Sequence, residues 1–475
     1  MFIGRQRELD FLNTAYQSSN AEFIVIYGRR RVGKTELITT FCEGKPNIFY
    51  AAKESTDSAQ LRSFSETVIS YDKGKFPFVD KFKDWETAFS ALAEVATEQK
   101  TVIVIDEFPY MVKGDKSIPS ILQNLWDHKL KNSNIMLILS GSSMSFIEDE
   151  VLGYKKPLYG RTTGIYKLDP LPYFDAVKFF PYYSDEDKLL VYSVLGGIPH
   201  YLLQFDGTKS LRENIVNTIL RRGSVLYNEV EFLLHEELRE PSTYNSIIEA
   251  VALGNTEYND ILNKTQIEQR TLSVYLKNLV NLGIVKREMP AASPIKEQAN
   301  SAKGLYTLTD NLFRFWYAFC YPNLSLLEKG DSQLVWETQV CENLHNYASK
   351  SFENVCIEYL YRQNADRALP AVFPNFSRWW GKVSHDGKNG KPFTVAEELD
   401  ILAENKQNKT FLIGECKFTN EPFDMGQVNK LLHKLPLKGA VHYYLFSLNG
   451  FTDGVKSYAA ENGNIVLVSA RDLLF

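Results

Sequence analysis

The run Gly28-Arg29-Arg30-Arg31-Val32-Gly33-Lys34-Thr35 has the spacing G-x-x-x-x-G-K-[ST], which is typical of a phosphate-binding loop. Residues 23–27 before it have the pattern of a buried strand, and a helical pattern follows from Glu36. In this setting backbone N–H groups wrap an anion, and the helix N-terminus adds positive partial charge. We expect ATP here, with the Lys34 ammonium on the β- and γ-phosphates and the Thr35 hydroxyl on Mg²⁺; a glycine turn without a ligand is the alternative. The expected nucleotide contacts are Gly28, Arg29, Val32, Gly33, Lys34, Thr35 and Glu36.

Two adjacent acids, Asp106 and Glu107, end a second buried run at residues 102–105. A strand that ends in two acids is the Walker B arrangement. Asp106 would complete the Mg²⁺ shell, and Glu107 would orient or deprotonate the attacking water. Solvated strand ends also carry such acids, but the phosphate loop upstream favours the catalytic interpretation.

Two further polar residues are candidates for the same site. The buried run at residues 136–139 ends in Ser140-Gly141-Ser142-Ser143, and Ser142 is the candidate sensor of the γ-phosphate or of the water. A strand end made of small residues is the alternative. Arg161 is a candidate arginine finger, and a surface salt bridge is its alternative. If Arg161 acts on another subunit's nucleotide, a homo-oligomer or a protein partner is required.

A second group of charged residues lies near the C-terminus, on two predicted strands at residues 399–403 and 411–418 around a polar turn. If Ala403 pairs with Thr410, Asp400 faces Ile413 and Glu398 faces Glu415. Side chains alternate along strands, so these residues share one face: Glu398, Asp400, Glu415 and Lys417. A second Mg²⁺ or Mn²⁺ would relieve the repulsion among the acids, and Lys417 would position its water. A hairpin with solvent-facing charges is the alternative.

Short buried runs separated by helical patterns predict an α/β fold with a parallel sheet at residues 1–168. A helical lid is expected at 169–240, a winged-helix domain at 241–310 and a helical connector at 311–345. An α/β domain is expected at 346–475.

The winged-helix prediction rests on three helical patterns followed by two short strands with a polar stretch between them. Its third helix and its wing present residues that suit phosphates and base edges. The candidate DNA contacts are Gln269, Arg270, Ser273, Lys277, Asn278, Lys286 and Arg287. We expect DNA as a partner, with docking of another protein as the alternative.

The 475 residues are 44% hydrophobic and 23% charged, with a net charge of −5. This composition excludes a disordered or collagen-like chain, as well as a basic nucleic-acid coat. The five cysteines form no C-x-x-C pair, which indicates reduced thiols. No apolar window of about 18 residues and no signal-peptide pattern is present, so a cytoplasmic protein without a membrane span is expected.

The motifs together resemble a family of archaeal and bacterial ATPases on the AAA+ side of the P-loop NTPases, near the signal-transducing STAND group. The resemblance is carried by Phe2-Ile3-Gly4-Arg5, the phosphate loop, Val104-Ile105-Asp106-Glu107-Phe108-Pro109-Tyr110 and Gly196-Gly197-Ile198-Pro199-His200-Tyr201. It implies that Gly4 and Arg5 lie near the adenine and that Pro199 lies in the lid. No clear lid arginine is present, which departs from typical AAA+ motors.

The C-terminal acids resemble a PD-(D/E)XK nuclease core. Asp400, Glu415 and Lys417 match its D…E-x-K motif, and Glu353 matches its first-helix acid, whereas Leu399 replaces the usual proline. The sequence therefore predicts an Mg²⁺-dependent ATPase that controls a DNA-binding, nuclease-like C-terminal region. A nucleotide-gated regulatory switch or a transcription regulator with an inactive nuclease-like domain is the alternative.

Overall fold

The buried runs expected from the sequence form two separate large sheets in the computed structural model, which describes residues 2–96, 99–238, 240–291, 304–386 and 392–474. The chain forms two compact units. The first consists of Met1–Leu171 with Ile198–His200, and the second of Pro172–Gly197 with Tyr201–Phe475. The boundaries expected at residues 240, 310 and 345 fall inside the second unit and stay predictions.

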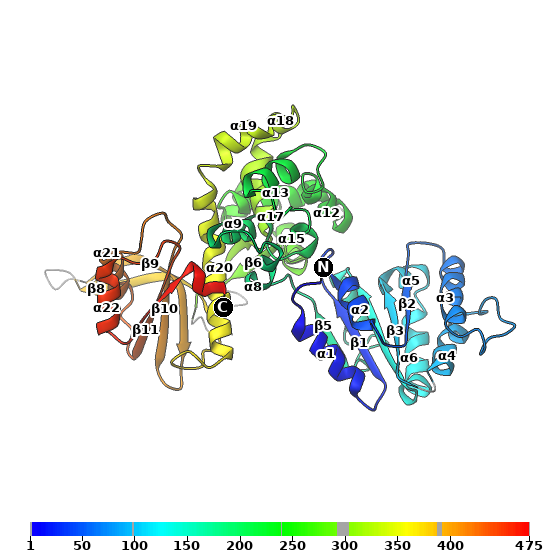
Figure 1. Ribbon diagram of the computed structural model, residues 1–475. Helices are drawn as coiled ribbons and strands as arrows, with labels where there is room; N and C mark the ends of the chain where they lie inside the picture. Colours follow the sequence, from blue (N-terminus) through cyan, green and yellow to red (C-terminus); the bar gives the residue numbers. More distant parts are fainter. Residues whose placement is uncertain (1, 97–98, 239, 292–303, 387–391, 475) are drawn as a thin grey trace. The chain divides into compact units, whose positions relative to one another are not determined.

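The N-terminal sheet has five parallel strands in the order β2-β3-β4-β1-β5 (Figure 1). The three buried runs expected from the sequence are β1, β3 and β4. Strand β4 lies between β1, which leads to the phosphate loop, and β3, which ends in Asp106. The strands are β1 (Glu22–Tyr27), β2 (Asn47–Ala51), β3 (Thr101–Asp106), β4 (Ile135–Gly141) and β5 (Gly164–Lys167).

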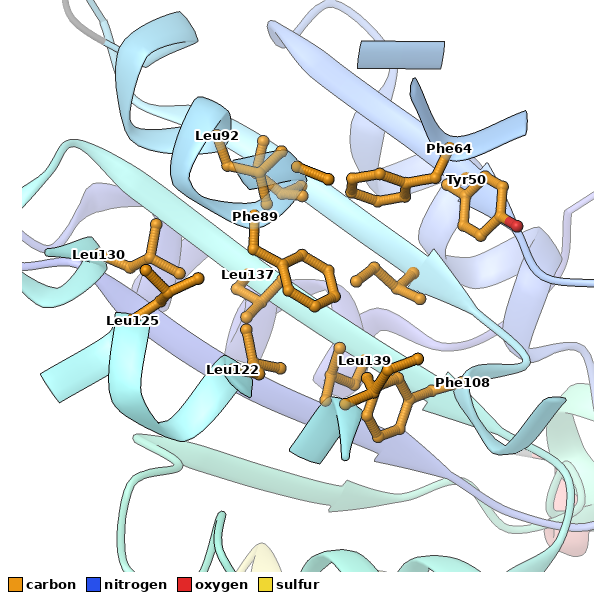
Figure 2. Packing of buried hydrophobic residues seen from close by; sticks show 14 of the residues in the cluster. Tyr50, Phe64, Phe89, Leu92, Phe108, Leu122, Leu125, Leu130, Leu137 and Leu139 are labelled. Carbon is orange, nitrogen blue, oxygen red and sulfur yellow. The ribbon is translucent and has the colours of Figure 1, made fainter. Parts of the chain in front are cut away.

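Helices cover both faces of this sheet, because alternate strand residues point to opposite sides. Phe23 and Val25 of β1 pack with the helices α3 to α6, and Ile24 and Ile26 pack with α1 and α2. Figure 2 shows the first of these cores, with Phe89 close to Leu137 of β4. The helices are α1 (Gln6–Gln17), α2 (Lys34–Cys42), α3 (Asp57–Tyr71), α4 (Trp85–Val95), α5 (Phe108–Gly114), α6 (Ile118–His128) and α7 (Met144–Phe146).

The second unit begins with a helical region. The helix expected over residues 185–195 is present as α9, whereas the one expected over 211–220 is divided into α11 and a π-helical turn, Val216–Leu220. Similar turns, Trp316–Cys320 and Trp336–Val340, follow α17 and α19. The helices are α8 (Tyr173–Ala176), α9 (Asp185–Leu195), α11 (Leu211–Ile215), α12 (Glu229–Glu237), α17 (Asn311–Phe315), α18 (Leu324–Leu327) and α19 (Ser332–Val335). Helix α10 (Pro199–Leu202) begins in the first unit and ends in the second.

Three helices and an antiparallel strand pair follow in the order expected for a winged helix. Gly283 ends the third helix with φ +66°, a left-handed conformation that favours glycine. The polar stretch expected between the strands lies outside the described residues from 292 to 303. The elements are α13 (Pro241–Ala252), α14 (Tyr258–Thr265), α15 (Gln269–Asn281), β6 (Val285–Glu288) and β7 (Leu305–Leu308).

The C-terminal sheet is mixed and has the order β12-β11-β10-β9-β8. The pairs β8–β9 and β9–β10 are antiparallel, whereas the pairs β10–β11 and β11–β12 are parallel. Helix α20 packs on one face through Phe352, whose ring lies 5.3 Å from that of Phe418, while α21 and α22 pack on the other through Val428 and Val455. The elements are α20 (Leu344–Ala365), β8 (Ser377–Asp386), β9 (Pro392–Asn405), β10 (Thr410–Lys417), α21 (Met425–Lys434), β11 (Ala440–Ser447), α22 (Asp453–Glu461) and β12 (Ile465–Ser469).

The register predicted for the β9–β10 hairpin is wrong. Ala403 lies opposite Leu412 rather than Thr410, because the strands continue to a shorter turn than expected. A shift of two positions keeps every side chain on its face, since the side-chain period of a strand is two. The shift moves Asp400 toward the Glu415 end of β10.

Candidate functional site

The phosphate loop keeps its shape because two of its glycines stand where other residues do not fit. A Cβ on Gly28 would lie 2.4 Å from the backbone oxygen of Leu168, so no side chain is accommodated there. Gly33 has φ +93° where the loop enters α2, a conformation that L-residues rarely adopt. The sequence spacing G-x-x-x-x-G therefore corresponds to two backbone requirements of this turn.

The Lys34 side chain is buried within this loop, with an exposed fraction of 6% for the residue. Its Nζ donates to the carbonyl oxygens of Gly28 at 2.9 Å and Arg29 at 3.1 Å. A buried ammonium at the centre of a loop that opens a helix favours a polyphosphate ligand. Lys34 thus lies inside the loop, and its contact with the β- and γ-phosphates stays a prediction.

Two predicted Mg²⁺ ligands are in contact. The Thr35 hydroxyl donates to Oδ2 of Asp106 at 2.7 Å, although the two residues are far apart in sequence. The other carboxylate oxygen of Asp106 accepts from the Ser140 hydroxyl on β4. These oxygen donors fit Mg²⁺, which Thr35 and Asp106 would hold and which would supply positive charge for the phosphates. Ser140 was not among the predicted site residues, although the sequence placed it at a strand end.

The predicted water-activating residue, Glu107, is held by the predicted sensor. Its Oε2 accepts from the Ser142 backbone N–H at 3.2 Å and from the Ser142 hydroxyl at 2.9 Å. Glu107 also has φ +52°, a left-handed conformation that is uncommon for a residue other than glycine. Strained backbone at this position fixes the direction in which the carboxylate leaves the sheet.

Two residues that the family resemblance associates with the nucleotide site, Arg5 and Pro199, also lie at the phosphate loop. Arg5 is 7% exposed, and its Nη2 donates to the Val32 oxygen at 3.0 Å, while its Nη1 pairs with Glu8 at 3.0 Å. The Pro199 ring lies 3.7 Å from the position of a Cβ on Gly33. The structure thus gathers Arg5 and Pro199 around the phosphate loop; a role for Gly4 in adenine binding stays a prediction.

Arg161 forms a bidentate ion pair with Asp127 of its own unit. Its Nε and Nη2 both donate to the carboxylate of Asp127 on α6, the shortest distance being 2.7 Å. Asp127 has a pKa below its usual range, chiefly because of the hydrogen bond from Arg161. This geometry favours the salt-bridge alternative over the predicted arginine finger.

In the C-terminal sheet, Asp400 lies close to the acids that the sequence grouped with it. Its Oδ2 accepts from the Cys416 backbone N–H at 2.8 Å. Burial raises the pKa of Asp400 to about 7, and the neighbouring Glu415 and Glu353 carboxylates add to the shift. Two strands and α20 thus bring three acids within electrostatic reach of one another.

Both oxygens of the Glu415 carboxylate are paired with lysines. Lys417 Nζ lies 2.7 Å from Oε1, and Lys434 Nζ, on α21, lies 2.9 Å from Oε2. Burial acts to lower the pKa of Lys417, but Glu415 outweighs this effect and raises it. Lys434 was missed by the sequence analysis, because nothing in its spacing connects α21 to the hairpin.

The remaining predicted acids are paired with cations as well. Glu353 pairs with Lys350 at 2.8 Å, and Arg378 of β8 lies 3.6 Å away. Glu398 forms an ion pair with Arg378 instead of lying opposite Glu415, which corrects the predicted register. Within the described ranges, no group of three or more His, Cys, Asp or Glu side chains has a geometry that could hold a metal ion. Metal ligation by Glu353, Asp400 and Glu415 stays a prediction.

The predicted DNA-contact residues form three groups: residues exposed on α15, residues of the wing, and Asn278. Arg270, Ser273 and Lys277 are exposed on α15, with the Ser273 hydroxyl 2.9 Å from that of Tyr258. On the wing, Lys286 pairs with Glu288 at 2.5 Å and the Arg287 guanidinium lies 6.0 Å from the Tyr306 ring centre. Asn278 is engaged inside the unit, donating to the Tyr244 hydroxyl at 2.7 Å.

The parallel sheet, the phosphate loop and the Thr35–Asp106 contact define the N-terminal unit as a P-loop ATPase domain that uses ATP and Mg²⁺. Residues 2–205 match the family described as "ATPase domain predominantly from Archaea", and residues 316–430 match "Archaea bacterial proteins of unknown function". An uncharacterized protein of Methanocaldococcus jannaschii is 34% identical over 477 residues, covering 99% of this chain and 100% of that protein. The chain belongs to the family of this archaeal ATPase domain.

Two further comparisons concern the ATPase part and the fold. An uncharacterized ATP-binding protein of the same organism is 51% identical over 45 residues, which are 10% of this chain and 76% of that protein. The structure of the Walker-type ATPase PABY2304 of Pyrococcus abyssi has a TM-score of 0.51 at 20% identity and covers 66% of this chain and 96% of that chain. This likeness shows the fold.

Among the residues that the structure describes, none of the helices has the length and apolar character needed to cross a bilayer.

Proposed function

We propose that this protein uses its ATPase cycle to control a DNA-binding, nuclease-like C-terminal region. The observation that carries the proposal is the convergence of Asp400, Glu415, Lys417 and Glu353 at one end of the C-terminal sheet. This is the side-chain set of the D…E-x-K motif, gathered from two strands and one helix. The same compact unit contains the winged-helix elements, so a DNA-binding element and the acids belong to one body.

The N-terminal unit supplies the nucleotide chemistry. Lys34 and the loop N–H groups neutralise phosphate charge, while Thr35 and Asp106 hold Mg²⁺. Glu107, once released by Ser142, orients the attacking water. Hydrolysis converts ATP and water to ADP and phosphate.

At the C-terminal acids, Asp400 and Glu415 would hold a divalent cation, which would supply Lewis-acid chemistry for phosphodiester hydrolysis. Lys434 has to leave Glu415 before a cation takes its place, because the ammonium lies at hydrogen-bond distance from Oε2. Lys417 stays beside Oε1 and positions the attacking water.

Cleavage of supercoiled plasmid tests the nuclease part. The full chain is incubated with Mg²⁺ or Mn²⁺ and with ATP, ADP or no nucleotide. We expect nicking that depends on metal and nucleotide and that is lost in Lys417→Ala, with Lys430→Ala, exposed on α21, as the control. Equal cleavage by the parent and Lys417→Ala, or no cleavage with either metal, rejects a nuclease.

A specific observation favours a second function, a nucleotide-gated switch whose C-terminal region binds DNA without cutting it. Each acid of the cluster except Asp400 is ion-paired with a cation, Glu415 with two of them. DNA binding that changes between ATP and ADP, together with intact plasmid, would establish the switch. Sequence-specific binding without cleavage would indicate a transcription regulator.

A further inference from the structure

A cavity of about 690 Å³ lies within the second unit, between the wing and the C-terminal sheet. Strand β6 and the residues after it, up to Ala291, form one wall, and β8, the end of β9 and α20 form the others. The two parts are in direct contact, since the Ala291 N–H donates to the Arg378 oxygen at 2.8 Å. Ala291 also packs in the apolar core of the C-terminal domain. The wing is therefore built into this domain.

The charged side chains that line the cavity are mostly cationic. Four are basic and two are acidic: Lys286, Arg287, Arg378 and Lys406, against Glu288 and Glu404. The amides of Asn354 and Asn375 and the hydroxyl of Ser377 add neutral hydrogen-bonding groups. Lys286 is paired with Glu288 and Arg378 with Glu398, so an anionic ligand would take the place of these carboxylates on the cations.

Arg378 is the residue that connects the cavity to the acid cluster. Its guanidinium pairs with Glu398 and lies 3.6 Å from both Glu288 and Glu353. Its Nε is buried and has no hydrogen-bond partner in the described structure, because the Glu353 oxygen is beyond hydrogen-bond distance. Arg378 therefore lacks a full set of hydrogen-bond acceptors, and an anion in the cavity can supply one once the side chain turns away from Glu353.

We propose that this cavity binds the sugar–phosphate backbone of single-stranded nucleic acid, with Arg378 and Lys406 as phosphate contacts. The inference rests on the proposed function and names its substrate class. The cavity volume is near the middle of the range for ligand pockets, roughly 300–1,000 Å³, which suits a nucleotide or two of one strand. Arg378 exchanges a carboxylate for a phosphate when the strand enters.

The cavity lies beside the candidate nuclease site, so a strand bound in it passes close to the acids. Glu353, the first-helix acid of the candidate nuclease site, lies beside Arg378. A phosphate on Arg378 therefore places the neighbouring phosphodiester next to the acid cluster. The wing residues Lys286 and Arg287 form one side of this strand-binding cavity, and they do not form a separate duplex-reading surface.

The test is fluorescence anisotropy with a labelled single-stranded oligonucleotide in EDTA, so that neither a metal nor cleavage is needed. The full chain is compared with Lys406→Ala, Arg378→Gln and the control Lys430→Ala. Lys406 is exposed at a turn, so its substitution does not threaten folding. We expect each cavity variant to bind about three- to tenfold more weakly and the slope of log K against log salt to fall by about 0.7 per lost contact. Lys430→Ala should bind like the parent.

Parent-like binding by both cavity variants overturns the inference, as does equal competition by polyglutamate, which would indicate an acidic protein partner. An equal loss of affinity in Lys430→Ala would show that general surface charge causes the binding, which would also overturn the inference. These outcomes are independent of the plasmid assay: a chain that never cuts DNA still reports whether the cavity binds a strand, and a chain that cuts still rejects this cavity if the variants bind normally.

Discussion

The Ser142 hydroxyl donates a 2.9 Å hydrogen bond to the carboxylate of Glu107, and the Ser142 backbone N–H adds a second bond at 3.2 Å. The two residues end neighbouring strands, β4 and β3, so their contact is a product of sheet order. A carboxylate oxygen that already accepts two hydrogen bonds is less free to accept one from a water molecule. Ser142 thus restrains the residue expected to activate the attacking water.

Ser142→Ala is expected to raise basal ATP turnover by up to about tenfold, the equivalent of one hydrogen bond to a charged group at about 1.5 kcal/mol. Steady-state phosphate release measures it. Ser143→Ala, next in sequence and without a capping hydrogen bond, is the matched control. Slower turnover in Ser142→Ala would show instead that the hydroxyl acts on the γ-phosphate. Glu107→Gln should lose turnover by about 10²-fold or more while binding ATP normally.

Arg161→Ala and Asp127→Ala are expected to act alike, because they remove the same partly exposed ion pair. Each should lower the free energy of unfolding of the N-terminal unit by less than about 1 kcal/mol and leave ATP turnover within about twofold of the parent. A double-mutant cycle followed by calorimetry and phosphate release checks this expectation. Loss of turnover by about 10³-fold in Arg161→Ala alone would restore the arginine-finger role.

Lys434→Ala is expected to tighten Mn²⁺ binding about three- to tenfold, because it removes the ammonium that competes for Oε2 of Glu415. Isothermal titration with Mn²⁺ in the absence of DNA measures this effect. Lys430→Ala on the same helix should leave the affinity unchanged. If neither the parent nor the two variants bind Mn²⁺, the result favours the nucleotide-gated switch that binds DNA without cutting it.

The stability of the second unit is expected to depend on Glu358. Its carboxylate accepts from the Tyr173 N–H at 2.7 Å and from the Tyr192 hydroxyl at 3.0 Å, and burial raises its pKa from 4.5 to about 7. The folded protein therefore holds this proton more tightly than the unfolded chain. The stabilisation is present below about pH 4.5 and is lost as the pH rises through 7, by about 3 kcal/mol.

Glu358→Gln should remove this dependence, so that its thermal midpoint exceeds that of the parent at pH 8 and matches it near pH 5. Differential scanning calorimetry at several pH values makes the comparison. Glu342→Gln, which changes an exposed carboxylate, should keep the pH profile of the parent. A parent-like profile in Glu358→Gln would show that another group titrates.

The local patterns in the sequence were sufficient to predict the phosphate loop and the acidic end of β3. The loop glycines, Lys34 and the acids of β3 follow from short-range requirements: a turn that only glycine adopts, and buried runs long enough for one strand each. The sequence also predicted the helices and strands of the winged-helix segment in their order. It missed β8, α21 and α22, which flank the C-terminal hairpin and carry Arg378 and Lys434.

By itself, the sequence determined which residues end each buried strand, because hydrophobic periodicity and glycine positions are local properties. Only the tertiary structure decided which of these ends meet. The order of the strands placed Ser142 against Glu107, and the turn length of the β9–β10 hairpin moved Asp400 toward Glu415. Packing of α21 and β8 then brought lysine and arginine side chains to the acids. Such contacts depend on how distant elements pack, so the spacing of residues along the chain does not predict them.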